Sequence, residues 1–142
     1  MSDQPQKPTV SEAQFNIARG QISIMTHHAG RVMAGTGATL ALVIANIGHF
    51  ADRPWHPIPL ILILIPAALS LLFAFQADTG LRGQAVLLNL AKSGDTVEPA
   101  DAMAGWGSQR PRLRKMLSTS GVVMMASISS AVLLIILLEI FA

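Results

Sequence analysis

The sequence predicts an all-α integral membrane protein in which an N-terminal amphipathic helix precedes three transmembrane helices. Composition is the first reason, because 51% of the 142 residues are apolar and only 13% are charged, unlike a soluble domain. The second reason is that three stretches reach the roughly 20 apolar residues that a helix needs to cross a bilayer core about 30 Å thick. These stretches are Val32–Phe50, Ile58–Ala77 and Met116–Phe141. Their apolar runs are continuous rather than alternating, which favours helices over a β-barrel.

The N-terminal residues predict a short polar tail followed by a helix start. Residues 1–9 are polar and contain two prolines, so we expect a disordered tail and no cleavable signal peptide. Two overlapping capping boxes follow, Thr9 with Glu12 and Ser11 with Gln14. A helix should therefore begin near residue 10 or 12.

Residues 10–30 predict an amphipathic interfacial helix. Apolar side chains recur there at three- and four-residue intervals, which gives the helix one apolar face. The members of this face are Phe15, Ala18, Ile22, Met25 and Ala29. A helix of this kind lies either in the membrane interface or on a neighbouring helix, and the pattern alone leaves both arrangements open.

Residues 31–77 predict a transmembrane helical hairpin. Small residues on one face of its first helix let another helix backbone approach closely, so we expect a helix–helix interface in a homo-oligomer or a larger membrane complex. This small-residue face consists of Gly30, Ala34, Ala38, Ala41 and Ala45. A tight turn joins the two helices and places Trp55 at the membrane interface. Pro66 interrupts the second helix, where we expect a kink rather than a moving element.

Residues 78–115 predict a cytoplasmic segment, and residues 116–142 predict the third transmembrane helix. The helical pattern of the second span can continue past Asp78 as far as Gly94, a typical helix stop. The segment is too short for a separate enzymatic domain. Any function must therefore use the membrane helices together with this short cytoplasmic segment.

The distribution of Lys and Arg predicts the orientation of the chain. The first loop carries Arg53 and the C-terminus carries no cation. The N-terminal arm and the second loop carry the others: Lys7, Arg19, Arg31, Arg82, Lys92, Arg110, Arg112, Arg114 and Lys115. By the positive-inside rule, the N-terminus and the second loop are cytoplasmic and the C-terminus lies outside, in a multi-pass membrane protein.

The stretch GSQRPRLRKML concentrates four of these cations just before the last apolar run. We expect Pro111 to prevent a regular helix at that point, so that the last helix starts nearby. The cluster has two interpretations, a topological anchor at the lipid phosphates or a site for an anionic ligand such as a nucleotide. The candidate anion-binding residues are Arg31, Arg110, Arg112, Arg114 and Lys115.

The sequence argues against catalysis and against a bound cofactor. There is no cysteine, no Ser-His-Asp arrangement and no set of metal-spaced ligands. The Gly35–Gly37 motif lacks the strand and the spacing of a phosphate loop. His27 and His49 are 22 residues apart, about 33 Å along a helix, so they cannot ligate one haem iron. We expect a protein that is not an enzyme, with no metal, no cofactor and no nucleic-acid partner.

The order of segments resembles the Pycsar-type transmembrane effectors. The similarity lies in a first span that begins HHAGRVMAGTGATLAL, a hairpin to PAALSLLFAFQAD, a cytoplasmic segment and a C-terminal span. It implies an inner-membrane effector of antiphage defence that responds to a cyclic pyrimidine nucleotide made by a partner cyclase and then impairs membrane integrity. Two other classes also fit the layout: a non-catalytic accessory subunit of a larger membrane complex, and a holin-like pore protein.

Overall fold

The computed structural model describes residues 9–54, 57–94 and 96–141. The described part of the chain is helical and contains no strand, which confirms the predicted all-α fold. Its helices are α1 (Glu12–Ala45), α2 (Ile47–Ala51), α3 (Pro57–Lys92) and α4 (Pro99–Phe141). Residues 1–8 of the expected disordered tail, and the expected interface residue Trp55, lie outside the described residues.

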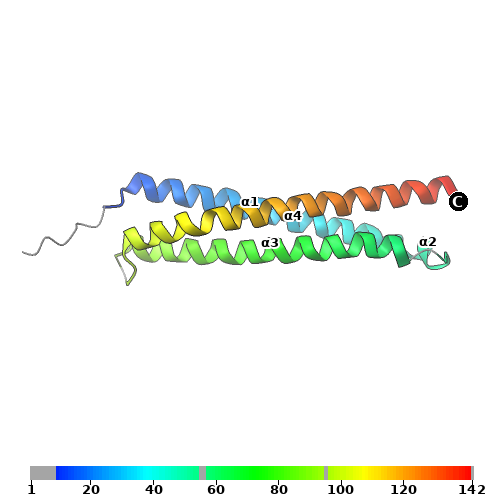
Figure 1. The fold of residues 1–142 in the computed structure, drawn as a ribbon, viewed down its shortest axis with the longest axis horizontal. Coiled ribbons are helices and arrows are strands. Elements are labelled where there is room, and N and C mark those ends of the chain that lie inside the picture. The colour runs from blue at the N-terminus through cyan, green and yellow to red at the C-terminus, as the bar shows by residue number, and fades with distance from the viewer. Residues whose placement is uncertain (1–8, 55–56, 95, 142) are drawn as a thin grey trace, which may run out of the picture.

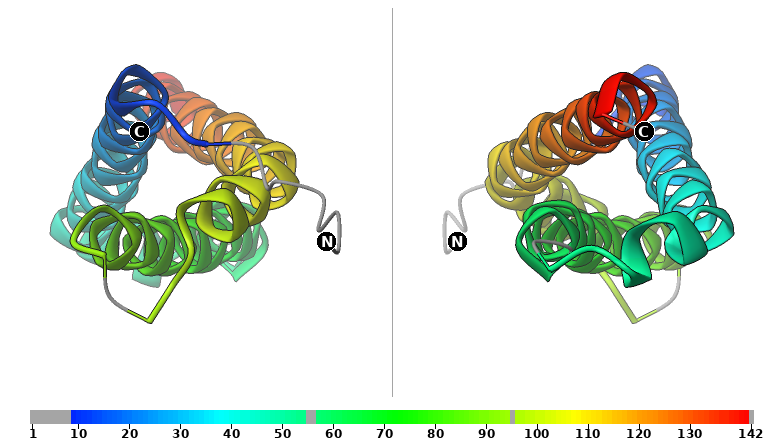
Figure 2. Two further views of the ribbon diagram at one scale, coloured as in Figure 1. Left: turned by 90° about the vertical axis from the view of Figure 1, so that its left-hand side faces the viewer. Right: turned by 90° about the vertical axis from the view of Figure 1, so that its right-hand side faces the viewer.

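The three long helices lie side by side along one axis (Figure 1). The start of α1 lies beside the connection between α3 and α4, and we call this the link end. The short helix α2 and the last residues of α4 lie at the opposite end, the α2 end. Seen along the axis, the long helices are tilted against one another and run along the three sides of a triangle (Figure 2). Helices α1 and α4 therefore run in the same direction, and α3 runs against both.

Helix α1 begins at the second of the two predicted capping boxes. The Ser11 hydroxyl accepts from the Gln14 backbone N–H at 3.3 Å, and the Gln14 side chain accepts from the Ser11 N–H at 2.9 Å. The helix then continues without a break through residues 30 and 31, where we expected one element to end and another to begin. It ends at Asn46, whose side-chain amide donates to the Leu42 carbonyl at 2.8 Å.

The apolar face of the first half of α1 packs on α3 and α4. Four of its five predicted members are buried in a core shared with those helices: Phe15, Ala18, Ile22 and Ala29. Of the two arrangements that the sequence left open, this segment adopts packing on neighbouring helices. The reason is that α3 and α4 extend far enough to cover it.

The predicted cytoplasmic segment is mostly helix. As expected, α3 continues to Lys92 and stops before Gly94, whose φ of 75° is the left-handed conformation that glycine adopts without strain. The expected start of the last helix near residue 111 or 116 is wrong, because α4 already begins at Pro99. Proline at the first helical position and Asp101 in the first turn both favour a start there.

Pro111 lies inside α4 and does not end it. A proline in a helix interior removes one backbone hydrogen bond and costs about 3 kcal/mol. Burial on both sides offsets that cost, since Trp106 and Leu113 are 3% and 5% exposed in the core shared with α1 and α3. Tertiary packing thus overrides the local preference that we used to place the helix start.

The interior consists of two apolar clusters separated by hydroxyl groups. The larger cluster lies in the link-end half, and a smaller one near the α2 end contains Val43, Ile63, Ala131 and Leu134. Between them, Ser70 Oγ donates to the Ser120 carbonyl at 3.0 Å, and Ser120 Oγ donates to the Ser70 carbonyl at 2.9 Å. Thr36 Oγ1 lies 3.3 Å from Ser70 Oγ. These three fully buried side chains join all three long helices.

Large apolar side chains cover the outside of the α2-end half. On α3 they are Ile58, Ile61, Leu62, Leu64, Ile65, Leu69, Leu72 and Phe75, and on α4 they are Val122, Met125, Val132, Leu133, Ile136, Leu137, Ile140 and Phe141. Among the described residues, Ile58–Lys92 and Pro99–Phe141 are long and apolar enough to cross a membrane. Helix α1 does not meet that criterion, and the expected first span, Val32–Phe50, is divided between α1 and α2 at Asn46.

Candidate functional site

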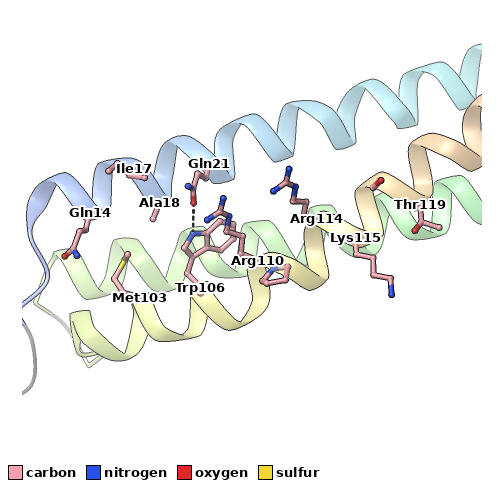
Figure 3. Close-up of a pocket in the computed structure, with 13 residues that line it drawn as sticks. Gln14, Ile17, Ala18, Gln21, Met103, Trp106, Arg110, Arg114, Lys115 and Thr119 are labelled. Atoms are coloured by element: carbon pink, nitrogen blue, oxygen red, sulfur yellow. Dashed lines mark hydrogen bonds between the residues drawn. The ribbon is translucent and has the colours of Figure 1, made fainter.

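A groove of about 820 Å³ separates the link-end halves of α1 and α4. Three of the predicted anion-binding residues line it, namely Arg110, Arg114 and Lys115. Arg110 and Arg114 are one helical turn apart, so they share one face of α4. Figure 3 shows both guanidinium groups turned towards α1, whereas the Lys115 ammonium group points away from it. The groove is therefore a site with two arginine forks on one wall.

The charge of this groove is uncompensated within its walls. Arg110 and Arg114 are exposed, and no carboxylate is among the described residues that line the groove. A guanidinium group offers two parallel N–H donors to a phosphate, and two such groups one turn apart can hold one phosphate from two sides. The arrangement is suited to binding a phosphate group, not to transferring protons.

One side-chain hydrogen bond connects the two helices that form the groove. Trp106 Nε1 donates to Gln21 Oε1 at 3.2 Å, which joins α4 to α1 at the bottom of the groove (Figure 3). This bond leaves the Gln21 carboxamide nitrogen available as a donor. The Gln14 carboxamide is in the same situation, because its oxygen is used in the N-terminal capping box. Two uncharged donors thus line the groove, Gln21 on the side of the arginines and Gln14 at its far end (Figure 3).

Pro111 also lines the groove, and it leaves one backbone carbonyl of α4 without its usual helical hydrogen bond. Because proline has no N–H, the carbonyl of Gly107 cannot receive the usual bond from four residues later in the helix. Gly107 lines the groove too, on the wall that carries Arg110. A ligand with donor groups beside its phosphate, such as a nucleobase amine, would match this combination.

The remaining predicted anion-binding residues lie elsewhere. Arg112 lines a second groove, between α3 and α4. Arg31 lies on the outer side of α1 in a shallow hollow of about 340 Å³ with His27 and His28. The five predicted residues are thus divided over three places, because the helical rotation of about 100° per residue turns Arg112 away from Arg110 and Arg114.

The small-residue face of α1 takes no part in packing within the chain. Gly30, Ala34, Ala38, Ala41 and Ala45 are all exposed. The contacts with α3 and α4 come from the opposite face, whose buried members include Val32, Thr36, Thr39 and Val43. The predicted interface is therefore free to meet a helix of another chain, and this remains a prediction.

The sequence reasoning missed Trp106 and the two glutamines of the groove. The spacing of Trp106, Arg110 and Arg114 at four-residue intervals is a helical pattern that could have identified one face. We overlooked it because we expected Pro111 to separate the tryptophan from the arginines. Gln14 and Gln21 carry no signal of their own, since only the packing of α1 on α4 brings them to the site.

Comparison with known proteins does not place this chain in a family. It matches no protein-family model, no curated protein and no solved structure. Within the described residues, there is also no group of three or more His, Asp or Glu side chains that could hold a metal ion. The functional argument therefore depends on the grooves and on the surface of the helices.

Proposed function

We propose that this chain is a non-catalytic protein of the bacterial inner membrane that binds a phosphate-bearing ligand in the groove between α1 and α4. The observation that carries the proposal is the convergence of Arg110 and Arg114 on one groove at the boundary of an apolar half-molecule. Exposed large side chains of that half, such as Leu133 and Phe141, suit contact with lipid tails. The cationic half suits the cytoplasmic surface.

In this proposal all three long helices cross the membrane. Thr36 of α1 contacts Ser70 of α3 between the two apolar clusters, so α1 accompanies α3 into the lipid. Helix α1 is less apolar than α3 and α4, but this is sufficient there because its buried face packs on those two helices. The link end, with most of the cations, is cytoplasmic, and the C-terminal end of α4 is outside.

The ligand that we propose is a cyclic pyrimidine nucleotide, cyclic CMP or cyclic UMP. The resemblance to Pycsar-type effectors suggests this class, and the groove offers matching chemistry. Arg110 and Arg114 supply two forks for the cyclic phosphate, and Gln21 and the Gly107 carbonyl supply a donor and an acceptor for a base. Binding would then promote assembly through the exposed small-residue face of α1 and impair the membrane, as in antiphage defence.

Isothermal titration of the purified full chain with cyclic CMP and cyclic UMP tests this proposal. We expect the parent to bind one of the two, and the double change Arg110→Lys with Arg114→Lys to weaken binding by at least about ten-fold, because lysine keeps the charge and loses the fork. Arg112→Lys is the matched control, since Arg112 lines the other groove and should leave binding unchanged. Equal binding by the parent and the double variant would show that the arginines do not hold the ligand.

One observation favours a second candidate, a non-catalytic accessory subunit. The small-residue face of α1 is exposed in the single chain, and the helix of a different protein could pack on it as well as a second copy could. In that case purification in a mild detergent would recover the chain with a stoichiometric partner. A homo-oligomer alone would favour the effector.

A further inference from the structure

The second groove lies between α3 and α4, where the apolar surface of α3 gives way to polar residues. Its volume is about 430 Å³. Phe75, Gln76 and Thr79 line it from α3, and Gln109, Arg112 and Met116 line it from α4. Phe75 ends the row of large exposed apolar residues on α3 that begins at Ile58, and the next ones on this helix are Val86 and Leu87, so the groove lies at the edge of that row.

Three polar side chains of this groove are donors without a hydrogen-bond partner in the part of the chain that the structure describes. Among the residues that the structure describes, Arg112, Gln76 and Gln109 have no side-chain hydrogen bond, and Arg112 is exposed. The ion pair between Asp78 Oδ2 and Arg82 Nε at 2.8 Å involves neither Arg112 nor the two carboxamides. The groove thus offers one arginine fork and two carboxamides to an anion.

The apolar part has a floor shaped by a glycine. A Cβ atom at Gly80 would lie only 2.7 Å from a methyl carbon of Leu113, so the absence of a side chain there lets Leu113 lie against α3. Leu113 is buried beneath the groove, while Phe75 and Leu72 are 63% and 50% exposed on the side of the apolar surface. An apolar chain could follow α3 from this point towards the α2 end.

We propose that the groove between α3 and α4 binds an anionic phospholipid of the cytoplasmic leaflet. Arg112 pairs with the lipid phosphate, the carboxamides of Gln76 and Gln109 donate to headgroup oxygens, and an acyl chain lies along Phe75 and Leu72. A free phosphate would leave those two apolar side chains uncovered, whereas a lipid covers them. This inference rests on the proposed membrane location but not on the nucleotide.

The stretch RPRLRK thereby serves two ligands through one helix. Arg110 and Arg114 face α1, and Arg112, between them in sequence, lines the groove on the α3 side. The two interpretations of the cluster, anchor and anion-binding site, are then both correct for different residues. Mutation of single arginines separates them.

Native mass spectrometry of the full chain tests the lipid site. The protein, purified in detergent, is mixed with dioleoyl phosphatidylglycerol or with dioleoyl phosphatidylcholine, and the bound fraction is measured for the parent, Arg112→Gln and Arg114→Gln. We expect the parent to retain phosphatidylglycerol preferentially, and Arg112→Gln to lower its retention about five-fold. Arg114→Gln removes the same charge from the other groove and should retain the lipid as the parent does.

Four results would overturn the proposal. One is a parent that shows no preference for phosphatidylglycerol. Another is an equal loss of the lipid by Arg112→Gln and Arg114→Gln, which would reduce the effect to overall charge. Displacement of the lipid by millimolar inorganic phosphate would make the groove a site for free anions instead. If Arg114→Gln loses nucleotide binding but still retains the lipid, the result bears on the groove between α1 and α4 and supports a separate lipid site. A parent that needs no detergent to remain in solution would contradict the membrane location, and the lipid site with it.

Discussion

At the scale of single residues, three buried hydroxyl groups hold the bundle together at its middle. Thr36, Ser70 and Ser120 are 0% exposed, and each lies on a different long helix. The reciprocal bonds between Ser70 and Ser120 satisfy both hydroxyl donors with carbonyls of the facing helix. Such bonds matter more among lipid tails, where apolar burial drives helix association less than it does in water.

Changing Ser120 to Ala should therefore destabilise the bundle by about 1 kcal/mol, because it removes the bond to the Ser70 carbonyl and leaves Ser70 with one partner fewer. Ser130→Ala is the matched control on the same helix, since Ser130 Oγ donates only to the Ala126 carbonyl of its own helix at 2.9 Å. Thermal unfolding in one detergent, followed by circular dichroism, compares the two. Equal midpoints for the two variants would contradict a central role for this contact.

At the scale of elements, α1 uses different faces for different neighbours. Its buried face contacts α3 and α4 along most of its length, from Phe15 to Val43. The face with Ala38 and Ala41 is exposed and lacks the large side chains that cover α3 and α4 at the same end. A helix that presents small residues where its neighbours present leucine and isoleucine is suited to close approach by another helix.

Ala38→Leu together with Ala41→Leu should weaken assembly of the chain, because the added bulk keeps a second helix backbone at a distance. The protein is cross-linked in membranes, and the fraction of oligomer is compared with that of the parent. Leu42→Ala, a change on the exposed side of the same turn that removes bulk, serves as the control. Unchanged cross-linking in the double leucine variant would mean that this face contacts lipid.

The elements also show how far the sequence alone could lead. The capping box at Ser11, the apolar face from Phe15 to Ala29 and the helix stop at Gly94 are local signals, and the structure confirms them. The start of α4 at Pro99 was missed because one proline, Pro111, was given more weight than the packing of Trp106 and Leu113 around it. The pairing of α1 with α4, which forms the first groove, depends on tertiary packing that no local pattern contains.

At the scale of the whole molecule, charge and apolar surface are largely separated along the long axis. Large exposed apolar side chains cover the α2-end half, whereas those described in the link-end half are scattered (Ile17, Ile24, Val86 and Leu87), and both arginine-lined grooves lie in that half. We propose that this separation arises because the membrane surrounds the α2-end half and the link-end half lies in the cytoplasm. The orientation, with the link between α3 and α4 inside the cell, is the central claim, because both ligand proposals require it.

Thiol labelling in intact cells tests this claim most directly, and the chain contains no cysteine of its own to interfere. Single cysteines replace Asp52, exposed beyond α2, and Ser108, exposed on α4 near the first groove. The account predicts that an impermeant maleimide labels Asp52→Cys in intact cells and labels Ser108→Cys only after the cells are permeabilised. Labelling of Ser108→Cys in intact cells, with Asp52→Cys protected, would place both grooves outside the cell and contradict the account.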